Sequence, residues 1–208
     1  MRIIFLDIDG VLNCELHYKS QNFNNYRDAK KQLRKDVKNE RIERLDYYKA
    51  QMCSERIGWL NELCKDIQAK VVISSTWRMG KTIDELKEIA TYCGGTFDII
   101  DKTPFLMSDD VVRGNEIHKW IKDNESLVGK YYDYKDYVII DDDSDMLLWQ
   151  KNNFFQTDSY SGLTPNTCYR IKRFFGQPTF PLLNNEQNVQ ESDTTDDDSS
   201  TKADNQKI

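Results

Sequence analysis

The stretch Ile3-Ile4-Phe5-Leu6-Asp7-Ile8-Asp9-Gly10 decides the fold class of this chain. Its four consecutive apolar residues are typical of a β-strand that is covered on both faces, as strands of parallel sheets are. Asp7 and Asp9 follow at once, and their i, i+2 spacing on an extended backbone points both toward one side. Gly10 then permits a sharp turn. The stretch predicts a buried strand ending in two acids that face one pocket, although such a pair alone also fits a solvated turn.

Two further apolar runs lead into polar side chains in the same way. Val71-Val72-Ile73 runs into Ser74-Ser75-Thr76-Trp77-Arg78, and Val138-Ile139-Ile140 runs into Asp141-Asp142-Asp143-Ser144-Asp145. Residues 97–100 and 154–157 are weaker strand candidates. Because helical patterns separate these runs, we expect an α/β fold, namely a doubly wound, Rossmann-like parallel sheet with helices on both faces.

The helices are expected from amphipathic spacing and from their end signals. Ser54, Thr82 and Thr164 can each accept a hydrogen bond from the first turn of a following helix. Pro165 suits the first turn of the last of these helices. A further helix is expected over residues 114–122. These segments would supply the layers that cover the sheet.

Residues 13–52 do not follow this alternation of strand and helix patterns. They are polar, and the second half, residues 28–52, has the pattern of a charged helix or helical pair. We expect a small helical cap insertion after the first strand, above the strand ends where open α/β sheets bind ligands. Residues 27–56 carry ten Lys or Arg against six Asp or Glu, a net charge of +4 that an anionic substrate would sense.

The overall composition bounds the domain organisation. The chain has 208 residues, of which 38% are hydrophobic, so it can bury a sizeable core and is not fibrous or wholly disordered. Residues 184–208 carry seven acids against two lysines and almost no large apolar side chains. We therefore expect one domain over residues 1–183, with the insertion over 13–52, followed by a disordered acidic tail over 184–208.

The compartment is inferred from what the sequence lacks. No apolar run approaches the ~18 residues of a membrane span, and acids interrupt the apolar N-terminal run, unlike a signal peptide. The five cysteines form no CxxC pair, so reduced thiols are expected in place of disulfides or a zinc site. These features favour a cytoplasmic protein that does not bind membranes.

Two acidic clusters at the ends of buried strands favour a magnesium site. The two strand ends would be neighbours in the expected sheet, and oxygen ligands from Asp7 and Asp142 are those that Mg²⁺ prefers. A calcium loop starting at Asp141 is excluded, because Met146 and Asn152 occupy the positions that require Gly and Glu.

Hydroxyl and guanidinium groups are candidates for binding phosphate. Ser74 and Ser75 at a strand end can bind phosphoryl oxygens, although a hydroxyl-rich helix cap explains them equally well. Arg113 opens a helix and could neutralise a transferring phosphoryl group, whereas an isolated arginine is usually a surface charge. Arg78 could clamp a substrate, while Trp77 is more typical of a core or hinge aromatic.

Four segments taken in order resemble the haloacid dehalogenase-like superfamily. They are residues 4–12, 72–78, 113–117 and 139–146. More narrowly, the chain resembles the branch associated with Swiss-army-knife RNA-repair proteins, which is distantly similar to the phosphatase domain of polynucleotide kinase-phosphatases. Residues 161–164 also fit that branch. The resemblance extends over about residues 1–175, with residues 13–52 matching poorly.

The resemblance implies roles for the acids. Asp7 would attack phosphorus and form an aspartyl-phosphate, and Asp9 would protonate the leaving alcohol and then deprotonate water. Asp7, the carbonyl of Asp9 and Asp142 would bind Mg²⁺, with Asp141 or Asp145 just beyond these ligands.

The resemblance also implies how the phosphoryl group is held. Ser74 would bind it, with Ser75 as the second choice. The superfamily usually has a lysine where this chain has Arg113, and Lys102 is a rival for that role.

We therefore expect a Mg²⁺-dependent phosphomonoester hydrolase that acts through an aspartyl-phosphate intermediate. Its partner would be a phosphorylated small molecule or a nucleotide or nucleic-acid phosphate end. A catalytically silent module that binds nucleic acid or protein and retains the acidic metal site is the alternative. The sequence leaves the oligomeric state open.

Overall fold

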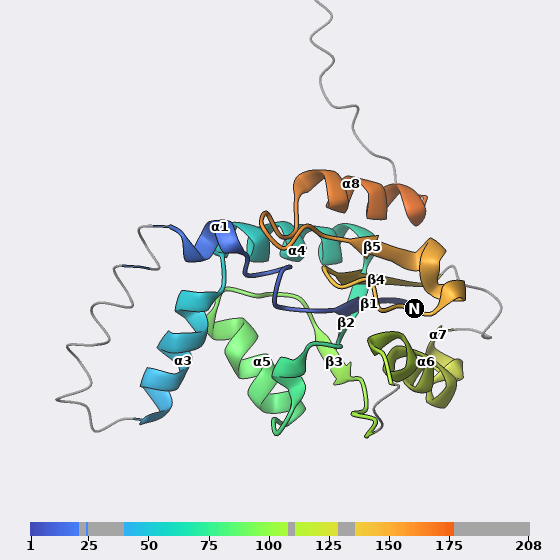
Figure 1. The fold of residues 1–208 in the computed structure, drawn as a ribbon, viewed down its shortest axis with the longest axis horizontal. Coiled ribbons are helices and arrows are strands. Elements are labelled where there is room, and N and C mark those ends of the chain that lie inside the picture. Colours follow the sequence, from blue (N-terminus) through green and yellow to red (C-terminus); the bar gives the residue numbers. More distant parts are fainter. Residues whose placement is uncertain (21–23, 25–39, 108–110, 129–135, 177–208) are drawn as a thin grey trace, which may run out of the picture.

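The computed structural model describes residues 1–20, 24, 40–107, 111–128 and 136–176 (Figure 1). Five strands form one parallel sheet in the order β3-β2-β1-β4-β5. The strands are β1 (Arg2–Leu6), β2 (Ala69–Ile73), β3 (Ile99–Lys102), β4 (Tyr137–Asp141) and β5 (Phe154–Gln156). The expected α/β fold is thus confirmed, and the third strand lies two residues later than its pattern indicated.

Helices cover both faces of this sheet. They are α1 (Glu15–Tyr18), α3 (Glu40–Gln51), α4 (Ser54–Ile67), α5 (Ile83–Tyr92), α6 (Arg113–Asp123), α7 (Glu125–Val128) and α8 (Pro165–Phe174), with the 3₁₀ turns η1 (Thr76–Arg78) and η2 (Leu148–Asn153). Buried side chains of α4, α5 and α8 share one cluster, and those of α6 and α7 share another. Figure 1 shows α4 and α8 on one side of the sheet and α6 and α7 on the other.

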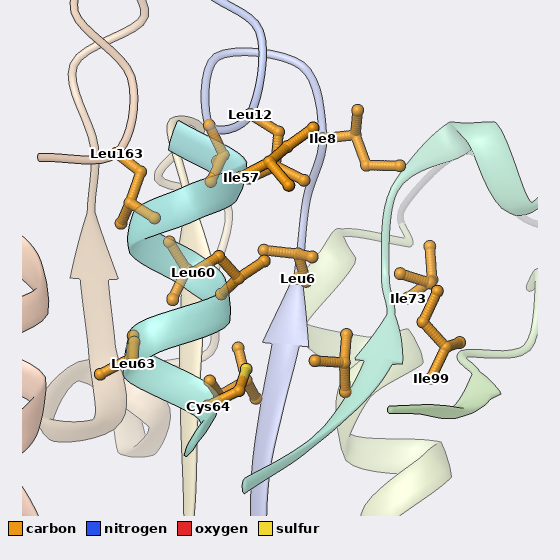
Figure 2. Packing of buried hydrophobic residues seen from close by; sticks show 14 of the residues in the cluster. Leu6, Ile8, Leu12, Ile57, Leu60, Leu63, Cys64, Ile73, Ile99 and Leu163 are labelled. Carbon is orange, nitrogen blue, oxygen red and sulfur yellow. The ribbon is translucent and has the colours of Figure 1, made fainter. Parts of the chain in front are cut away.

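Alternation along the strands directs side chains into these two clusters. Ile4 and Leu6 of β1 belong to the first cluster, whereas Ile3 and Phe5 belong to the second. Figure 2 shows Leu60, Leu63 and Cys64 of α4 packing over this first face of the sheet. On the other face the ring of Phe5 meets that of Trp120 edge-on, with 5.3 Å between the centroids. The central strand is therefore buried on both sides, as its continuous apolar run predicts.

The helix ends follow their sequence signals closely. The Thr82 hydroxyl accepts a hydrogen bond from the Glu85 N–H at 3.2 Å, and Glu85 Oε2 accepts one from the Thr82 N–H at 2.8 Å, so the two residues form a capping box. Thr164 caps α8 with its side chain alone, by accepting a hydrogen bond from the Thr167 N–H at 3.2 Å. Ser54 was expected to be a cap, but it is the first residue of α4 and Cys53 precedes it, so this prediction was wrong by one residue.

The insertion after β1 is helical where the structure describes it. It contains α1 and α3, and α3 packs against α5. The rest of the expected helical pair lies outside the described residues, as does the tail expected over 184–208. In the described part of the chain no helix is both long and apolar enough to cross a membrane.

The core allows a matched test of packing on α4. Leu60 is fully buried, so Leu60→Ala is expected to lower the free energy of unfolding by about 2–5 kcal/mol. Gly58→Ala is the control, because no atom lies within 4 Å of the added methyl group and alanine favours a helix by about 1 kcal/mol over glycine. Urea unfolding checks both variants. A Leu60→Ala protein as stable as the wild type would contradict this packing.

Candidate active site

The strand register brings three chain segments to one edge of the sheet. Leu6, the last residue of β1, pairs with Ile73 of β2 on one side and Ile140 of β4 on the other. The Asp7 N–H donates to the Ile140 carbonyl at 3.0 Å, and the Ser74 N–H donates to the Leu6 carbonyl at 2.9 Å. In the sheet, β2 lies on one side of β1 and β4 on the other, so the strand order reverses direction at β1. Open α/β sheets bind ligands at topological switch points of this kind.

Asp7, Asp141 and Asp142 converge at this edge. One carboxylate oxygen from each lies within 4.8 Å of the others. Gly10 makes the approach possible, because a Cβ at that position would lie 2.2 Å from the Asp142 carboxyl carbon. Gly10 also has a φ of +67°, a conformation that favours glycine. The sharp turn expected at this residue therefore also makes room for Asp142.

Burial and mutual repulsion make these acids hard to ionise. Burial raises the pKa of Asp7 to about 6, although the neighbouring Arg113 opposes the shift. Burial, followed by the charge of Asp7, raises the pKa of Asp141 to about 8. The pKa of Asp142 is also raised, chiefly by burial. A cation placed among the three oxygens would reverse these shifts.

The donor set fits Mg²⁺. Asp141 Oδ2 is buried and has no hydrogen-bond partner among the described residues, and a buried oxygen of this kind normally has a partner. Carboxylate oxygens are the ligands that a hard cation takes. Asp7, Asp141 and Asp142 could hold such an ion. From the sequence we expected Asp9 to contribute only its backbone carbonyl to the metal site. Its carboxylate is not part of this group.

Arg113 contacts two of the acids. Its Nη1 donates to Asp7 Oδ1 at 2.9 Å and lies 3.9 Å from Asp141 Oδ2. The backbone N–H of Arg113 donates to Asp145 Oδ2 at 2.9 Å, so Asp145 caps α6 and fixes its first residue. The rival Lys102 instead donates to the backbone carbonyls of Arg78 and Lys81.

Asp9 follows Asp7 by two residues and is exposed to solvent. Its Oδ1 accepts a hydrogen bond from Asn13 Nδ2 at 2.7 Å, and its Oδ2 accepts one from Trp77 Nε1 at 3.0 Å. Asn13 also accepts from the Gly10 N–H at 3.0 Å, which closes the turn that follows β1. The Asp9 carboxylate is thus oriented by the loops after two different strands.

The two serines differ in what they contact. Ser75 accepts a hydrogen bond from the Trp77 N–H at 3.3 Å, and its hydroxyl also hydrogen-bonds Asp7, which opposes a small part of the rise in the pKa of Asp7 that burial causes. Ser74 Oγ is buried and has no partner in the described part of the chain. Ser74 therefore has the hydroxyl with unused hydrogen-bonding capacity next to the acids.

Arg78 is buried and pairs with Glu116 of α6. The Arg78 guanidinium also donates to four backbone carbonyls, those of residues 74, 75, 103 and 104. Glu116 Oε1 in turn accepts from the Leu106 N–H at 3.1 Å. This pair joins the loop after β2, the segment after β3 and helix α6. The contacts of Arg78 therefore hold the backbone of these segments in place. The expected contact of Arg78 with substrate stays a prediction.

A cleft of about 780 Å³ opens beside Arg113. The polar and charged residues that line it are Thr76, Arg78, Arg113, Glu116 and Asp145. Met79, Phe105 and Met107 also line it and are 44%, 53% and 89% exposed. The cleft thus combines a cation with an apolar wall, a surface suited to a phosphate attached to a flat or apolar group.

The fold and the acidic edge define a haloacid dehalogenase-like domain, as the sequence resemblance predicted. The family model described as the HAD domain in Swiss Army Knife RNA repair proteins matches residues 3–168. Because this match covers most of the chain, the chain belongs to that family. Neither the comparison with curated proteins nor that with solved structures gave a match.

Sequence reasoning missed part of the site. Asn13 was not singled out, although an Asn four residues after Asp9 and next to a glycine turn is a typical turn residue. Glu116 was missed because its partner Arg78 is 38 positions away. Trp77 packs against the core as expected and also donates to Asp9, which its type and position do not reveal.

The raised pKa values of Asp7 and Asp141 predict how the stability of the metal-free protein depends on pH. Asp7 and Asp141 ordinarily titrate near 3.8 but have pKa values of about 6 and about 8 in the fold. Between pH 3.8 and the raised pKa of each acid, the folded chain binds more protons than the unfolded chain. The free energy of unfolding therefore falls as pH rises, by about 1.4 kcal/mol per pH unit for each acid. Metal-free protein should therefore lose thermal stability from about pH 4 to about pH 8, most steeply below about pH 6 where both acids contribute, and Mg²⁺ should restore it most at the upper end.

Asp141→Asn is the matched variant for this measurement. It removes one repelling charge and should flatten the pH dependence and weaken the stabilisation by Mg²⁺. Metal-free wild-type protein that gains stability across the same pH range would contradict the proposed environment of these acids.

The Arg78–Glu116 pair can be compared with a surface pair. Glu116→Gln leaves a buried guanidinium without a counter-charge and should lower the free energy of unfolding by about 3 kcal/mol. Asp98→Asn breaks an exposed pair with Lys70, whose atoms are 2.7 Å apart, and should cost less than about 1 kcal/mol. Urea unfolding measures both variants. Equal effects would show that the buried pair has no special structural role.

Proposed function

We propose that this chain is a Mg²⁺-dependent phosphomonoester hydrolase that acts through an aspartyl-phosphate at Asp7. One observation carries the proposal. Asp7 lies at the end of the central strand, its carboxylate accepts a hydrogen bond from Arg113 at 2.9 Å, and it belongs to a group of three acids that can hold a cation. Membership of the haloacid dehalogenase-like family supports the same activity.

Asp7 and Asp9 have different roles in the proposed reaction. An Asp7 oxygen attacks phosphorus and the bond to the leaving oxygen breaks, while Asp9 supplies a proton to that oxygen. Asp9 then takes a proton from the water that cleaves the aspartyl-phosphate. Asp9 is exposed to solvent and follows Asp7 by two residues, which supports this role. Asp7, Asp141 and Asp142 would hold Mg²⁺, whose positive charge would keep the nucleophile ionised and offset phosphoryl charge.

Arg113 and Ser74 hold the phosphoryl group in this proposal. Arg113 remains charged at every relevant pH and has further N–H groups beyond the one that Asp7 accepts. The Ser74 hydroxyl has unused hydrogen-bonding capacity, and Ser75 is already engaged with Asp7 and Trp77. Arg113 fills the position where the superfamily usually has a lysine, and its contact with Asp7 favours it over Lys102.

The proposed substrate is a phosphorylated nucleotide or nucleic-acid end. The exposed side chains of Phe105 and Met107 beside Arg113 offer a surface on which a base could stack. The description of the matching family, which names RNA repair, supports this substrate class. A phosphorylated small molecule that lacks a base would use the acids and leave the apolar wall unoccupied.

One observation favours the catalytically silent alternative. Both oxygens of Asp9 accept hydrogen bonds, from Asn13 and Trp77, so the carboxylate must give up one of these bonds before it can serve a leaving group. A module that binds phosphorylated ends without turnover would not need this change.

Phosphate release with Mg²⁺ tests the proposal. The probes are an aryl phosphate, sugar phosphates, mononucleotides and oligoribonucleotides phosphorylated at the 3′ or 5′ end. Asp7→Asn should abolish release, a loss on the order of 10³-fold or more, because the nucleophile is gone. Asp9→Asn should lower kcat by about 10²–10⁴-fold.

Asp98→Asn is the control, since Asp98 is exposed and pairs with Lys70 away from the acids. It should retain wild-type activity. Wild-type protein that is stabilised by Mg²⁺ but releases phosphate from none of the probes would support the silent module, and activity that survives in Asp7→Asn would exclude the aspartyl-phosphate.

A further inference from the structure

A second cluster of reactive side chains lies where α1, α3 and α4 meet. Cys53 separates α3 from α4 and directly precedes the fourteen-residue helix α4. Its N–H donates to the Leu12 carbonyl at 2.9 Å, which ties it to the segment after β1. All five cysteines belong to the described part of the chain, and Cys53 is partly exposed whereas the other four are buried. Cys53 is therefore the thiol that solvent reaches most readily.

Arg56 donates to the Cys53 sulfur. Arg56 Nη1 lies 2.8 Å from Cys53 Sγ, and a guanidinium has N–H donors and no acceptor, so the contact is favourable when the sulfur accepts. Arg56 is buried and fixed in place, because its Nε donates to the Ser161 carbonyl at 2.8 Å. The guanidinium therefore favours the thiolate over the thiol.

His17 of α1 lies next to this sulfur. Its Nε2 lies 2.8 Å from the Ala50 carbonyl, and because a carbonyl only accepts, this nitrogen carries a proton. The ring also hydrogen-bonds Cys53, and this contact is the main reason why the pKa of His17 is raised. The raised pKa of His17 favours the charged imidazolium beside the sulfur.

The charges around the sulfur agree with this geometry. Burial opposes ionisation of Cys53, but the hydrogen bond from His17 and the nearby Arg56 outweigh it and lower the pKa of Cys53 to about 6. Glu55 of α4 lies 3.8 Å from Arg56 Nη1 and is largely exposed, so it offsets the guanidinium only weakly. By contrast, burial raises the pKa of Cys64 and Cys168 to about 12.

We propose that Cys53, paired with His17 and held by Arg56, is a reactive thiolate and a site of oxidation by hydrogen peroxide. The sulfur attacks one peroxide oxygen, the O–O bond breaks, and the leaving hydroxide takes the proton of the His17 imidazolium. The products are a sulfenic acid at Cys53, neutral His17 and water. The sulfur loses two electrons and the peroxide gains them. This chemistry is independent of the acidic site and of phosphate release.

The pH profile of alkylation tests the thiolate. Iodoacetamide labelling of each cysteine is followed by peptide mass spectrometry, in the folded protein and in urea. Half-maximal labelling of Cys53 is expected near pH 6 in the fold and near pH 8.5 in urea. At pH 6 folded Cys53 should react about tenfold faster than unfolded Cys53, after allowing for the lower nucleophilicity of a low-pKa thiolate. Coincident folded and unfolded profiles would overturn the proposal.

Two variants assign the cause, and a trapping reagent tests the oxidation. His17→Gln and Arg56→Lys should each move the Cys53 labelling midpoint toward the value in urea, while circular dichroism monitors the fold. After exposure to peroxide, dimedone should trap a sulfenic acid at Cys53 in the wild type, and no adduct should form in Cys53→Ser. Adducts on the buried cysteines in place of Cys53, or unchanged midpoints in both folded variants, would contradict the assignment.

Discussion

The mutual repulsion of three carboxylates at the ends of two adjacent strands is the constraint on which this structure depends. Asp7, Asp141 and Asp142 lie within 4.8 Å of one another, and burial raises the pKa of each. Arg113 offsets only part of the charge, since Asp7 and Asp141 retain raised pKa values beside it. The arrangement is stable with ionised acids only when a cation joins them, and that requirement links the fold to the chemistry.

The fold keeps the repelling groups in place through contacts that lie outside the acids. Backbone hydrogen bonds of the parallel sheet set the positions of Asp7 and Ser74. Asp145 caps α6 and so fixes Arg113, while the buried Arg78–Glu116 pair joins α6 to the loop after β2. The mutually repelling acids are therefore held in place by the surrounding secondary structure. Each reactive side chain follows a strand end or begins a helix.

Most of the fold and the acids could be predicted from local sequence. Apolar runs that end in Asp7, Ser74 and Asp141 specify strands whose ends meet, because parallel strands align their carboxyl ends. Contacts between distant segments could not be predicted. The hydrogen bond from Trp77 to Asp9 and the burial of Glu116 beside Arg78 depend on how loops from different strands pack, and neither leaves a periodic pattern in the sequence.

The most direct test of the central claim is a crystal structure of the protein grown with Mn²⁺ and beryllium fluoride, with anomalous scattering used to locate the cation. We expect one anomalous peak at the carboxyl edge of the sheet, among the carboxylates of Asp7, Asp141 and Asp142, and a beryllofluoride group on the Asp7 carboxylate beside Arg113. A cation bound elsewhere, or Asp7 unmodified with Arg113 turned away from it, would contradict the account.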